Sequence, residues 1–184
     1  MRKNYELKVK LSNYDTAKWK AESFIKSFSD KHHFAEIQKD IYFSKIGGKR
    51  LKLRIINNEK GVLIYYDRKD VAEKRVSKYF LSETNNPYEM EKILKNFFKV
   101  QLIVNKKREI YTAKNIRIHV DRVQGCGTFL EFEIIYNHLE DAKVIMKNLM
   151  KHFMLKHSDF IKESYSDLVL KNKNKKNVST PKKR

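Results

Sequence analysis

Cysteine is almost absent from this chain of 184 residues, which contains Cys126 alone. A single cysteine excludes an intramolecular disulfide, and it offers nothing like the cysteine spacing of a zinc site. Cys126 lies between two glycines, where we expect a structural role. Because no disulfide framework is present, a reducing compartment is favoured, and we expect the protein to be cytoplasmic.

Long apolar runs are also missing. The first residues, MRKNYELKVKL, contain no apolar core of a signal peptide. No later run approaches the roughly 18 consecutive apolar residues that a membrane-spanning helix requires. We therefore expect a soluble protein without a membrane partner.

Acidic residues are few relative to basic ones. The chain has 41 Lys and Arg against 22 Asp and Glu, which gives a formal net charge of +19. Such a charge favours polyanionic partners: nucleotides, polyphosphate, nucleic acid or an acidic surface. Hydrophobic residues make up 41% of the chain, enough to build the core of one domain. The composition predicts a folded, basic protein with a negatively charged partner.

The end of the sequence differs from the rest in composition. Residues 171–184, KNKNKKNVSTPKKR, have almost no apolar content, so burial cannot offset the entropy of ordering them. We predict a disordered basic tail over 171–184 and one folded domain over 1–170. The tail is compatible with nuclear localisation or with binding to nucleic acid, although a small-molecule partner is favoured.

Apolar and charged residues alternate along much of the chain, as in YELKVKL near its start. A period of two places all the charged side chains on one face of a strand. The same pattern predicts further strands over 36–44, 50–56, 62–68, 75–82, 100–107 and 109–113, with turns at residues 47–48 and 57–61. It also predicts a hairpin over 115–134, whose turn contains Gly125 and Gly127.

Four segments have the apolar spacing of a helix instead: 16–29, a stretch that opens at Pro87, 139–153 and 158–170. Their apolar stripes are more typical of core packing than of a ligand groove. His32 and His33 fall in a predicted loop, and we expect no metal there because no third ligand is near in sequence. The fold class is therefore α+β.

The charged strand faces have two interpretations. In RLKLR, Arg50, Lys52 and Arg54 share one face within roughly 13 Å of strand, and Glu131 and Glu133 share a face of the hairpin. Alternation alone favours a half-buried sheet whose charged face lies in water. If the sheet closes into a barrel, the same charged faces line its interior.

Eight segments together resemble one known family, the CYTH or triphosphate tunnel metalloenzymes, and especially its class IV adenylate cyclase-like branch. They follow the family's order over about Lys3 to Leu170, and they are YELKVKL, QKDIYF, GGKRLKLR, LIYYDRKD, KRVSKYF, VNKKREIY, IRIHVDRVQGCGTFLEFEI and ESYSDL. The resemblance implies an eight-stranded antiparallel β-barrel with helices packed outside. Its tunnel would hold a triphosphate and one or two Mg²⁺ or Mn²⁺ ions.

The resemblance also implies roles for individual residues. Hard divalent ions need oxygen ligands, and a phosphate chain needs several cations. Metal would be held by Glu6, Asp121, Glu131 and Glu133. Triphosphate would be bound by Lys8, Lys10, Lys52, Arg54, Arg68, Arg75, Lys106, Arg108 and Arg117. Asp121, which could instead position an attacking water, and Lys10 would be the catalytic residues.

One position departs from the family's first-strand motif, E-x-E-x-K. Glu6, Lys8 and Lys10 stand at the three specified positions, so Lys8 replaces the second carboxylate. An ammonium there adds a phosphate donor and removes a metal ligand. We expect one divalent ion to bind well and a second ion weakly or not at all.

These features leave three functions open. The favoured one is hydrolysis of a nucleoside triphosphate, thiamine triphosphate or tripolyphosphate, because inward cations around a metal ion stabilise phosphoryl transfer. The alternative is an adenylate cyclase, in which the ribose 3'-hydroxyl of ATP attacks the α-phosphate, although no nucleoside pocket is visible in the motifs. The third is a non-catalytic binder of polyphosphate, nucleotides or RNA 5'-triphosphate ends. Either a monomer or a homodimer fits the sequence.

Overall fold

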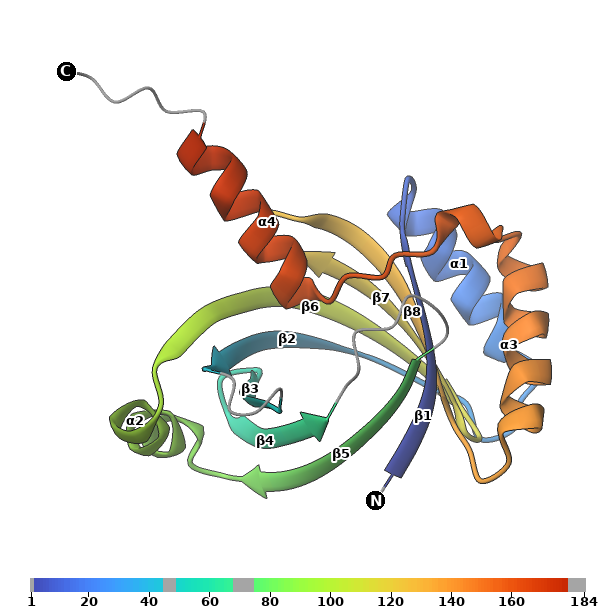
Figure 1. Ribbon diagram of the computed structural model, residues 1–184. Coiled ribbons are helices and arrows are strands. Elements are labelled where there is room, and N and C mark those ends of the chain that lie inside the picture. The colour runs from blue at the N-terminus through green and yellow to red at the C-terminus, as the bar shows by residue number, and fades with distance from the viewer. Residues whose placement is uncertain (1, 45–48, 68–74, 179–184) are drawn as a thin grey trace.

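Eight antiparallel strands close into a barrel in the order β1-β5-β4-β3-β2-β6-β7-β8 (Figure 1). The computed structural model describes residues 2–44, 49–67 and 75–178. The strands are β1 (Arg2–Lys10), β2 (His32–Phe43), β3 (Arg50–Ile56), β4 (Lys60–Asp67), β5 (Arg75–Thr84), β6 (Val100–Ala113), β7 (Ile116–Val123) and β8 (Gly127–Ile135). The helices are α1 (Tyr14–Ile25), α2 (Pro87–Phe97), α3 (Leu139–Phe153) and α4 (Tyr165–Val178), with a short 3-10 helix at His157–Asp159. The predicted eight-stranded barrel with external helices is confirmed.

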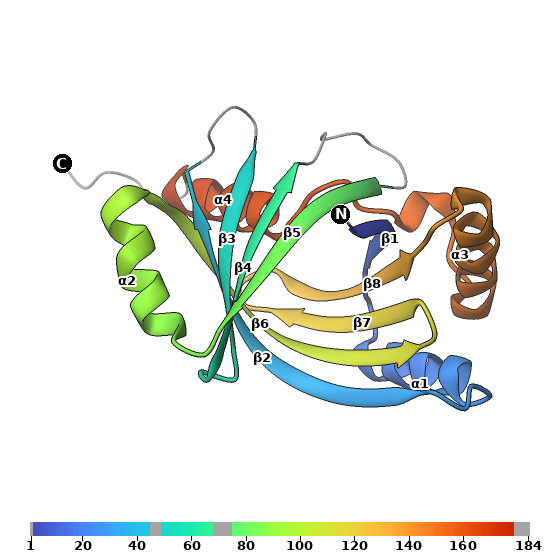
Figure 2. The same cartoon turned by 90° about the horizontal axis from the view of Figure 1, so that it is seen from below.

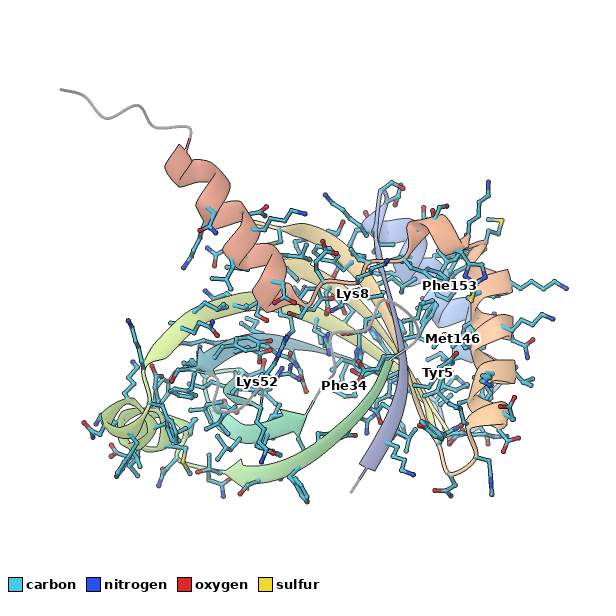
Figure 3. The ribbon with its side chains drawn as sticks, in the orientation of Figure 1. Tyr5, Lys8, Phe34, Lys52, Met146 and Phe153 are labelled. Carbon is cyan, nitrogen blue, oxygen red and sulfur yellow. The ribbon has the colours of Figure 1, made fainter. Side chains whose placement is uncertain are left out.

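The largest part of the core lies outside the barrel. Tyr5, Leu7 and Val9 of β1 are buried against α1 and α3, whereas the alternate residues face the barrel interior. Figure 3 shows Tyr5 next to Met146 and Phe153 of α3, in the layer between strand and helix. Because apolar residues are used on the outer face, period two leaves the charged residues to line the inside.

Helix α2 covers a different part of the outer surface. Its Leu94 packs with Ile41 of β2 and Leu53 of β3, and Figure 2 shows this helix well apart from α1 and α3. Pro87 opens the helix directly after Asn86, as predicted. Proline fits there because its missing N–H would have had no partner in the first turn.

Helix α4 packs against one end of the barrel, where the interior is apolar (Figure 1). Tyr165, its first residue, joins Tyr42, Val104, Val123 and Phe129, which project inward from the strands. Their side chains fill the barrel at this end. The remaining interior is open for a ligand.

Helix α4 also extends beyond the predicted end of the folded domain. It continues to Val178, eight residues into the segment 171–184 that we predicted to be a disordered tail, and residues 179–184 lie outside the described chain. Lysine is a good helix former and is favoured near a helix C-terminus, and the Asn172 amide donates to the Gly125 carbonyl at 2.9 Å. The helix propensity of lysine and the Asn172–Gly125 hydrogen bond therefore stabilise this part of α4, although it contains almost no apolar residues.

Three other boundaries differ from the prediction. His32 and His33 begin β2 instead of lying in a loop, because β2 pairs with β6 from His32 onward. The two segments predicted around Arg108 form one continuous strand, β6, whose run of cations stays in register with β7. The helix predicted over 158–170 starts only at Tyr165.

Two further predictions concern a turn and the absence of a membrane-spanning helix. The turn at residues 47–48 lies outside the described residues. None of the helices in the described part of the chain is long and apolar enough to cross a membrane.

Candidate functional site

The barrel encloses a cavity of about 560 Å³, lined by residues of all eight strands and by Ser164 and Tyr165 at the start of α4. This volume is typical of sites for small organic ligands. The lining divides into three walls of different chemistry. Figure 3 shows Lys52, Lys8 and Phe34, one from each wall, directed into the interior.

The first wall is cationic and centres on Asp40 of β2. Arg54 donates to both Asp40 carboxylate oxygens, at 2.7 and 2.9 Å. The ammonium groups of Lys52 and Lys106 approach the same carboxylate at 3.1 and 3.0 Å. Asp40 is fully buried, so one carboxylate gathers cations from β3 and β6 at a single place.

This clustering changes the protonation of its members. Burial would raise the pKa of Asp40, but Arg54, Lys106 and Lys52 hold it well below its ordinary value. Burial lowers the pKa of Lys106 to about 7, with repulsion from Arg54 and Arg108 opposing the attraction of Asp40. Burial, aided by Arg54, likewise lowers the pKa of Lys52 to about 8. With three cations around one carboxylate, the wall still lacks negative charge, which a phosphate chain would supply.

Arg108 connects the cationic wall to the acidic one. Its guanidinium donates to Asp121 at 2.7 and 2.6 Å and to Glu131 at 2.7 Å. Asp121 also accepts a 2.5 Å hydrogen bond from the Tyr165 hydroxyl. Asp121 is fully buried and is not among the residues that line the cavity. It therefore orients Arg108 and anchors the start of α4.

The second wall carries three glutamates, Glu6 of β1 and Glu131 and Glu133 of β8. Glu6 pairs with Glu133 across β1 and β8, and Lys8 pairs with Glu131 one step further along. Directly opposed residues are close neighbours in a sheet, so this register brings the three glutamates together. The Lys8 ammonium lies 3.4 Å from Glu131 and 3.9 Å from the centre of the Tyr165 ring.

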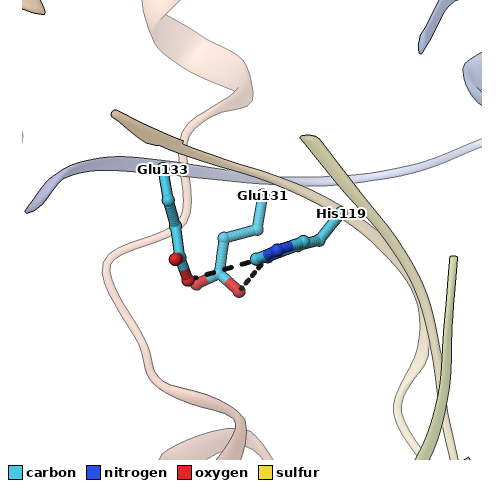
Figure 4. Close-up of side chains that lie close together, drawn as sticks. All are labelled: His119, Glu131 and Glu133. Atoms are coloured by element: carbon cyan, nitrogen blue, oxygen red, sulfur yellow. Dashed lines mark ion pairs between the residues drawn. The ribbon is translucent and has the colours of Figure 1, made fainter. Parts of the chain in front are cut away.

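His119 of β7 completes a group of three possible ligands with Glu131 and Glu133 (Figure 4). One ligand atom of each lies within 4.8 Å of the others. His119 Nδ1 is 3.6 Å from Glu133 and 3.9 Å from Glu131, and this buried nitrogen has no hydrogen-bond partner in the described chain. Two carboxylates and an imidazole nitrogen left without a partner fit a divalent metal ion.

The third wall is apolar and is formed mainly by β3, β4 and β5. Its residues are Phe34, Ile56, Val62, Ile64, Leu81 and Ile110. Beside them the buried side-chain oxygen of Gln38 accepts no hydrogen bond from the described residues, while its amide donates to Glu36. This wall offers an apolar surface and one acceptor, which suits an organic group better than a phosphate.

The structure brings most of the predicted site residues together. Nine of them line the cavity: Glu6, Lys8, Lys52, Arg54, Lys106, Arg108, Arg117, Glu131 and Glu133. Lys10 does not. It is exposed at the filled end of the barrel, near Gly127. Arg75 opens β5, where its backbone pairs with Glu6, and Arg68 lies outside the described residues.

The residues of the site that were not assigned from the sequence include Asp40, His119, Tyr165 and Gln38. Two of them had a usable pattern. His119 shares its strand face with Arg117 and Asp121, and Asp40 shares its strand face with Gln38, so each lies on a face that turns inward when the sheet closes. The sequence could not show that cations surround the Asp40 carboxylate, because that arrangement depends on which strands pair.

The fold and the lining define a class of protein, a closed β-barrel whose charged interior is suited to holding a polyanion beside a divalent ion. The chain belongs to the CYTH domain family, whose model matches residues 2–165. It is 25% identical over 172 residues to a Methanocaldococcus jannaschii protein provisionally named an adenylate cyclase, covering 89% of this chain and 96% of that protein.

Solved structures share the fold. The PH1012 protein of Pyrococcus horikoshii superposes with a TM-score of 0.77 at 28% identity, covering 91% of this chain and 99% of that one. A Hippeastrum protein, provisionally named an adenylyl cyclase and described as having a dominant triphosphatase activity, superposes with a TM-score of 0.66 at 16% identity. The match covers 93% of this chain and 96% of the Hippeastrum chain.

Proposed function

We propose that this protein is a divalent-metal-dependent triphosphatase that hydrolyses a triphosphate bound inside the barrel. The observation that carries the proposal is that the cationic wall and the acidic wall line the same cavity. Lys52, Arg54 and Lys106 converge on the first, and Glu131, Glu133 and His119 lie on the second. The family membership and the activity ascribed to the Hippeastrum protein support the same reaction.

The cationic wall would bind the phosphate chain. Phosphoryl transfer spreads negative charge over the oxygens of the transferred group, so fixed cations lower its barrier. Arg54, Lys106 and Lys52 are already gathered by Asp40, and little reorganisation is needed when the substrate arrives. Arg108, held by Asp121, would contact the end of the chain nearest the carboxylates.

The acidic wall would hold the metal ion. Glu131, Glu133 and His119 are the residues whose ligand atoms lie together, and Glu6 is the cross-strand neighbour of Glu133. The ion, when bound, neutralises phosphate oxygens and lowers the pKa of a coordinated water. The Lys8 ammonium lies 3.4 Å from Glu131, where it favours an anionic substrate over a second ion.

The apolar wall suits a triphosphate that carries an organic group better than it suits inorganic tripolyphosphate. It therefore favours a second candidate function, that of an adenylate cyclase. Ile64, Leu81 and the neighbouring side chains could pack against a nucleobase, and the Gln38 oxygen could accept from its amino group. In that case the ribose 3'-hydroxyl would attack the α-phosphate and pyrophosphate would leave. The apolar wall would contact the same nucleoside whether ATP is hydrolysed or cyclised.

One experiment separates these functions. The protein is incubated with ATP, thiamine triphosphate or tripolyphosphate, each with Mg²⁺ or Mn²⁺, and the products are identified by chromatography. We expect release of inorganic phosphate that requires metal. Cyclic AMP with pyrophosphate would establish the cyclase instead, and no turnover of any substrate would contradict both enzymatic functions.

A further inference from the structure

The buried nitrogen of His119 is not explained by the packing around it. The side chain is 5% exposed, and its Nδ1 makes no hydrogen bond within the described residues. A buried polar atom left without a partner costs about 1–3 kcal/mol, so such atoms are uncommon. The two nearest acidic oxygens, on Glu133 and Glu131, are 3.6 and 3.9 Å away and are also directed into the cavity.

The ion pairs of this nitrogen with Glu133 and Glu131, at 3.6 and 3.9 Å, are longer than hydrogen bonds and require a protonated imidazole. Arg108 and Lys8 are oriented toward Glu131, at 2.7 and 3.4 Å. Glu133 has weaker neighbours, since the Asn4 amide is 3.3 Å away and Arg117 is 4.0 Å away. Glu133 and His119 are therefore the pair most available to a ligand that bonds to both.

An imidazole nitrogen distinguishes between the two ions expected for this family. Mg²⁺ is a hard cation that takes oxygen ligands and retains much of its water. Mn²⁺ binds nitrogen ligands less tightly than the later first-row ions do, but it accepts an imidazole more readily than the harder Mg²⁺ does, and it also accepts carboxylates. A mixed set of one imidazole and two carboxylates should thus bind Mn²⁺ more tightly than Mg²⁺.

We propose that His119 Nδ1 is a metal ligand, together with Glu133 and Glu131, and that this nitrogen makes the site selective for Mn²⁺ over Mg²⁺. The inference rests on the metal dependence proposed above and decides between the two ions left open there. It concerns the resident ion and is independent of which triphosphate is the substrate.

The test observes the metal directly, without relying on turnover. Purified protein, alone and with a non-hydrolysable ATP analogue, is titrated with MnCl₂ and with MgCl₂ by calorimetry. Pulsed electron paramagnetic resonance of the bound Mn²⁺ then detects any directly coordinated nitrogen. We expect nitrogen coupling, and an affinity for Mn²⁺ at least about tenfold above that for Mg²⁺.

Two variants make the assignment specific. His119→Asn should remove the nitrogen coupling and weaken Mn²⁺ binding by about tenfold or more, with much less effect on Mg²⁺. The matched control is His33→Asn, because His33 also pairs with a glutamate, Glu109 at 3.1 Å, but outside the cavity lining. This control should bind both ions as the unmodified protein does. Thermal melts of both variants check that the fold is intact.

These experiments can reject His119 as a metal ligand without rejecting the proposed triphosphatase activity, and the reverse. Bound Mn²⁺ without nitrogen coupling, equal losses for Mn²⁺ and Mg²⁺ in His119→Asn, or no Mn²⁺ binding in either preparation would overturn the assignment. Metal-dependent hydrolysis could still be observed in the first two cases. Conversely, nitrogen coupling in a protein that turns over no triphosphate would support the metal site and reject the enzyme.

Discussion

Asp40 and Lys106 lie 66 positions apart in the chain, yet the Lys106 ammonium donates to the Asp40 carboxylate at 3.0 Å inside the barrel. Both side chains are almost completely buried. Arg54 and Lys52 contact the same carboxylate, so Asp40 is the negative charge that allows three cations to share a small volume. The cationic wall depends on this acid.

The first prediction concerns that dependence. Asp40→Asn keeps the volume but leaves the buried cations without their counter-charge, and it should lower the free energy of unfolding by about 3 kcal/mol. Tripolyphosphate should restore much of this loss, because its oxygens replace the missing carboxylate. Urea denaturation with and without tripolyphosphate measures both effects. Asp141→Asn, at an exposed position on α3, is the control, and an equally small change in both variants would contradict the role of Asp40.

The second prediction is a pH dependence of triphosphate affinity. The pKa of free Lys106 is lowered to about 7, and a bound phosphate would raise it. The contribution of this ammonium to binding is therefore complete below pH 7 and is lost as the pH rises through the bound-state pKa. Calorimetry with tripolyphosphate in EDTA, from pH 6.5 to about pH 9.5, should show affinity falling at the alkaline end. Subtracting the profile of Lys106→Met removes the titration of the ligand itself. Parallel profiles for the two proteins would rule out Lys106 as the cause.

The third prediction concerns Glu131 and Glu133. Changing both to Gln removes the negative charge at nearly constant volume, so metal-dependent turnover should be abolished. Glu133→Gln alone should lose metal binding with little loss of stability, because its hydrogen bond from Asn4 is long, at 3.3 Å, and its ion pairs with His119 and Arg117 are 3.6 and 4.0 Å long. Glu131→Gln should also destabilise the fold, because Arg108 donates to Glu131 at 2.7 Å. Metal titration and thermal melts of each variant test the distinction. Unchanged turnover of the double variant would exclude these residues as ligands.

The fourth prediction concerns Lys8. Lys8→Glu adds a fourth carboxylate to the wall of Glu6, Glu131 and Glu133 and should let a second Mn²⁺ bind, while metal-free triphosphate binds more weakly. Lys8→Met should weaken triphosphate binding without recruiting an ion. Calorimetric stoichiometry with Mn²⁺ and a non-hydrolysable triphosphate distinguishes the two variants. If Lys8→Glu alters neither stoichiometry nor anion affinity, Lys8 has no role in the cavity.

Strand faces could be predicted from the sequence because side chains alternate strictly along a strand. Lys52, Arg54 and Glu131 were assigned to charged faces this way, and closure of the sheet turned those faces inward. The resemblance supplied that closure, since alternation alone favours a half-buried sheet whose charged face lies in water.

The remaining features depend on which strands pair and on what fills the barrel ends. Asp40 meets Lys106 only because β2 lies beside β6. Asp121 and Lys10 follow the inward period of their strands, but the apolar cluster under α4 fills the barrel at that level. Tyr165 joins this cluster from a segment whose approach to the barrel has no local pattern in the sequence.

The claim that a triphosphate binds inside the barrel is tested most directly by two adjacent lysines of β6. Lys106 faces the cavity, whereas Lys107 is exposed on the outer face. Tripolyphosphate is titrated at pH 7 into Lys106→Met, Lys107→Met and the unmodified protein. Binding within the barrel predicts a loss of about tenfold or more for Lys106→Met, the effect of one charge-assisted hydrogen bond, and a change below about twofold for Lys107→Met. Equal affinities in Lys106→Met and the unmodified protein, or a larger loss in Lys107→Met, would contradict it.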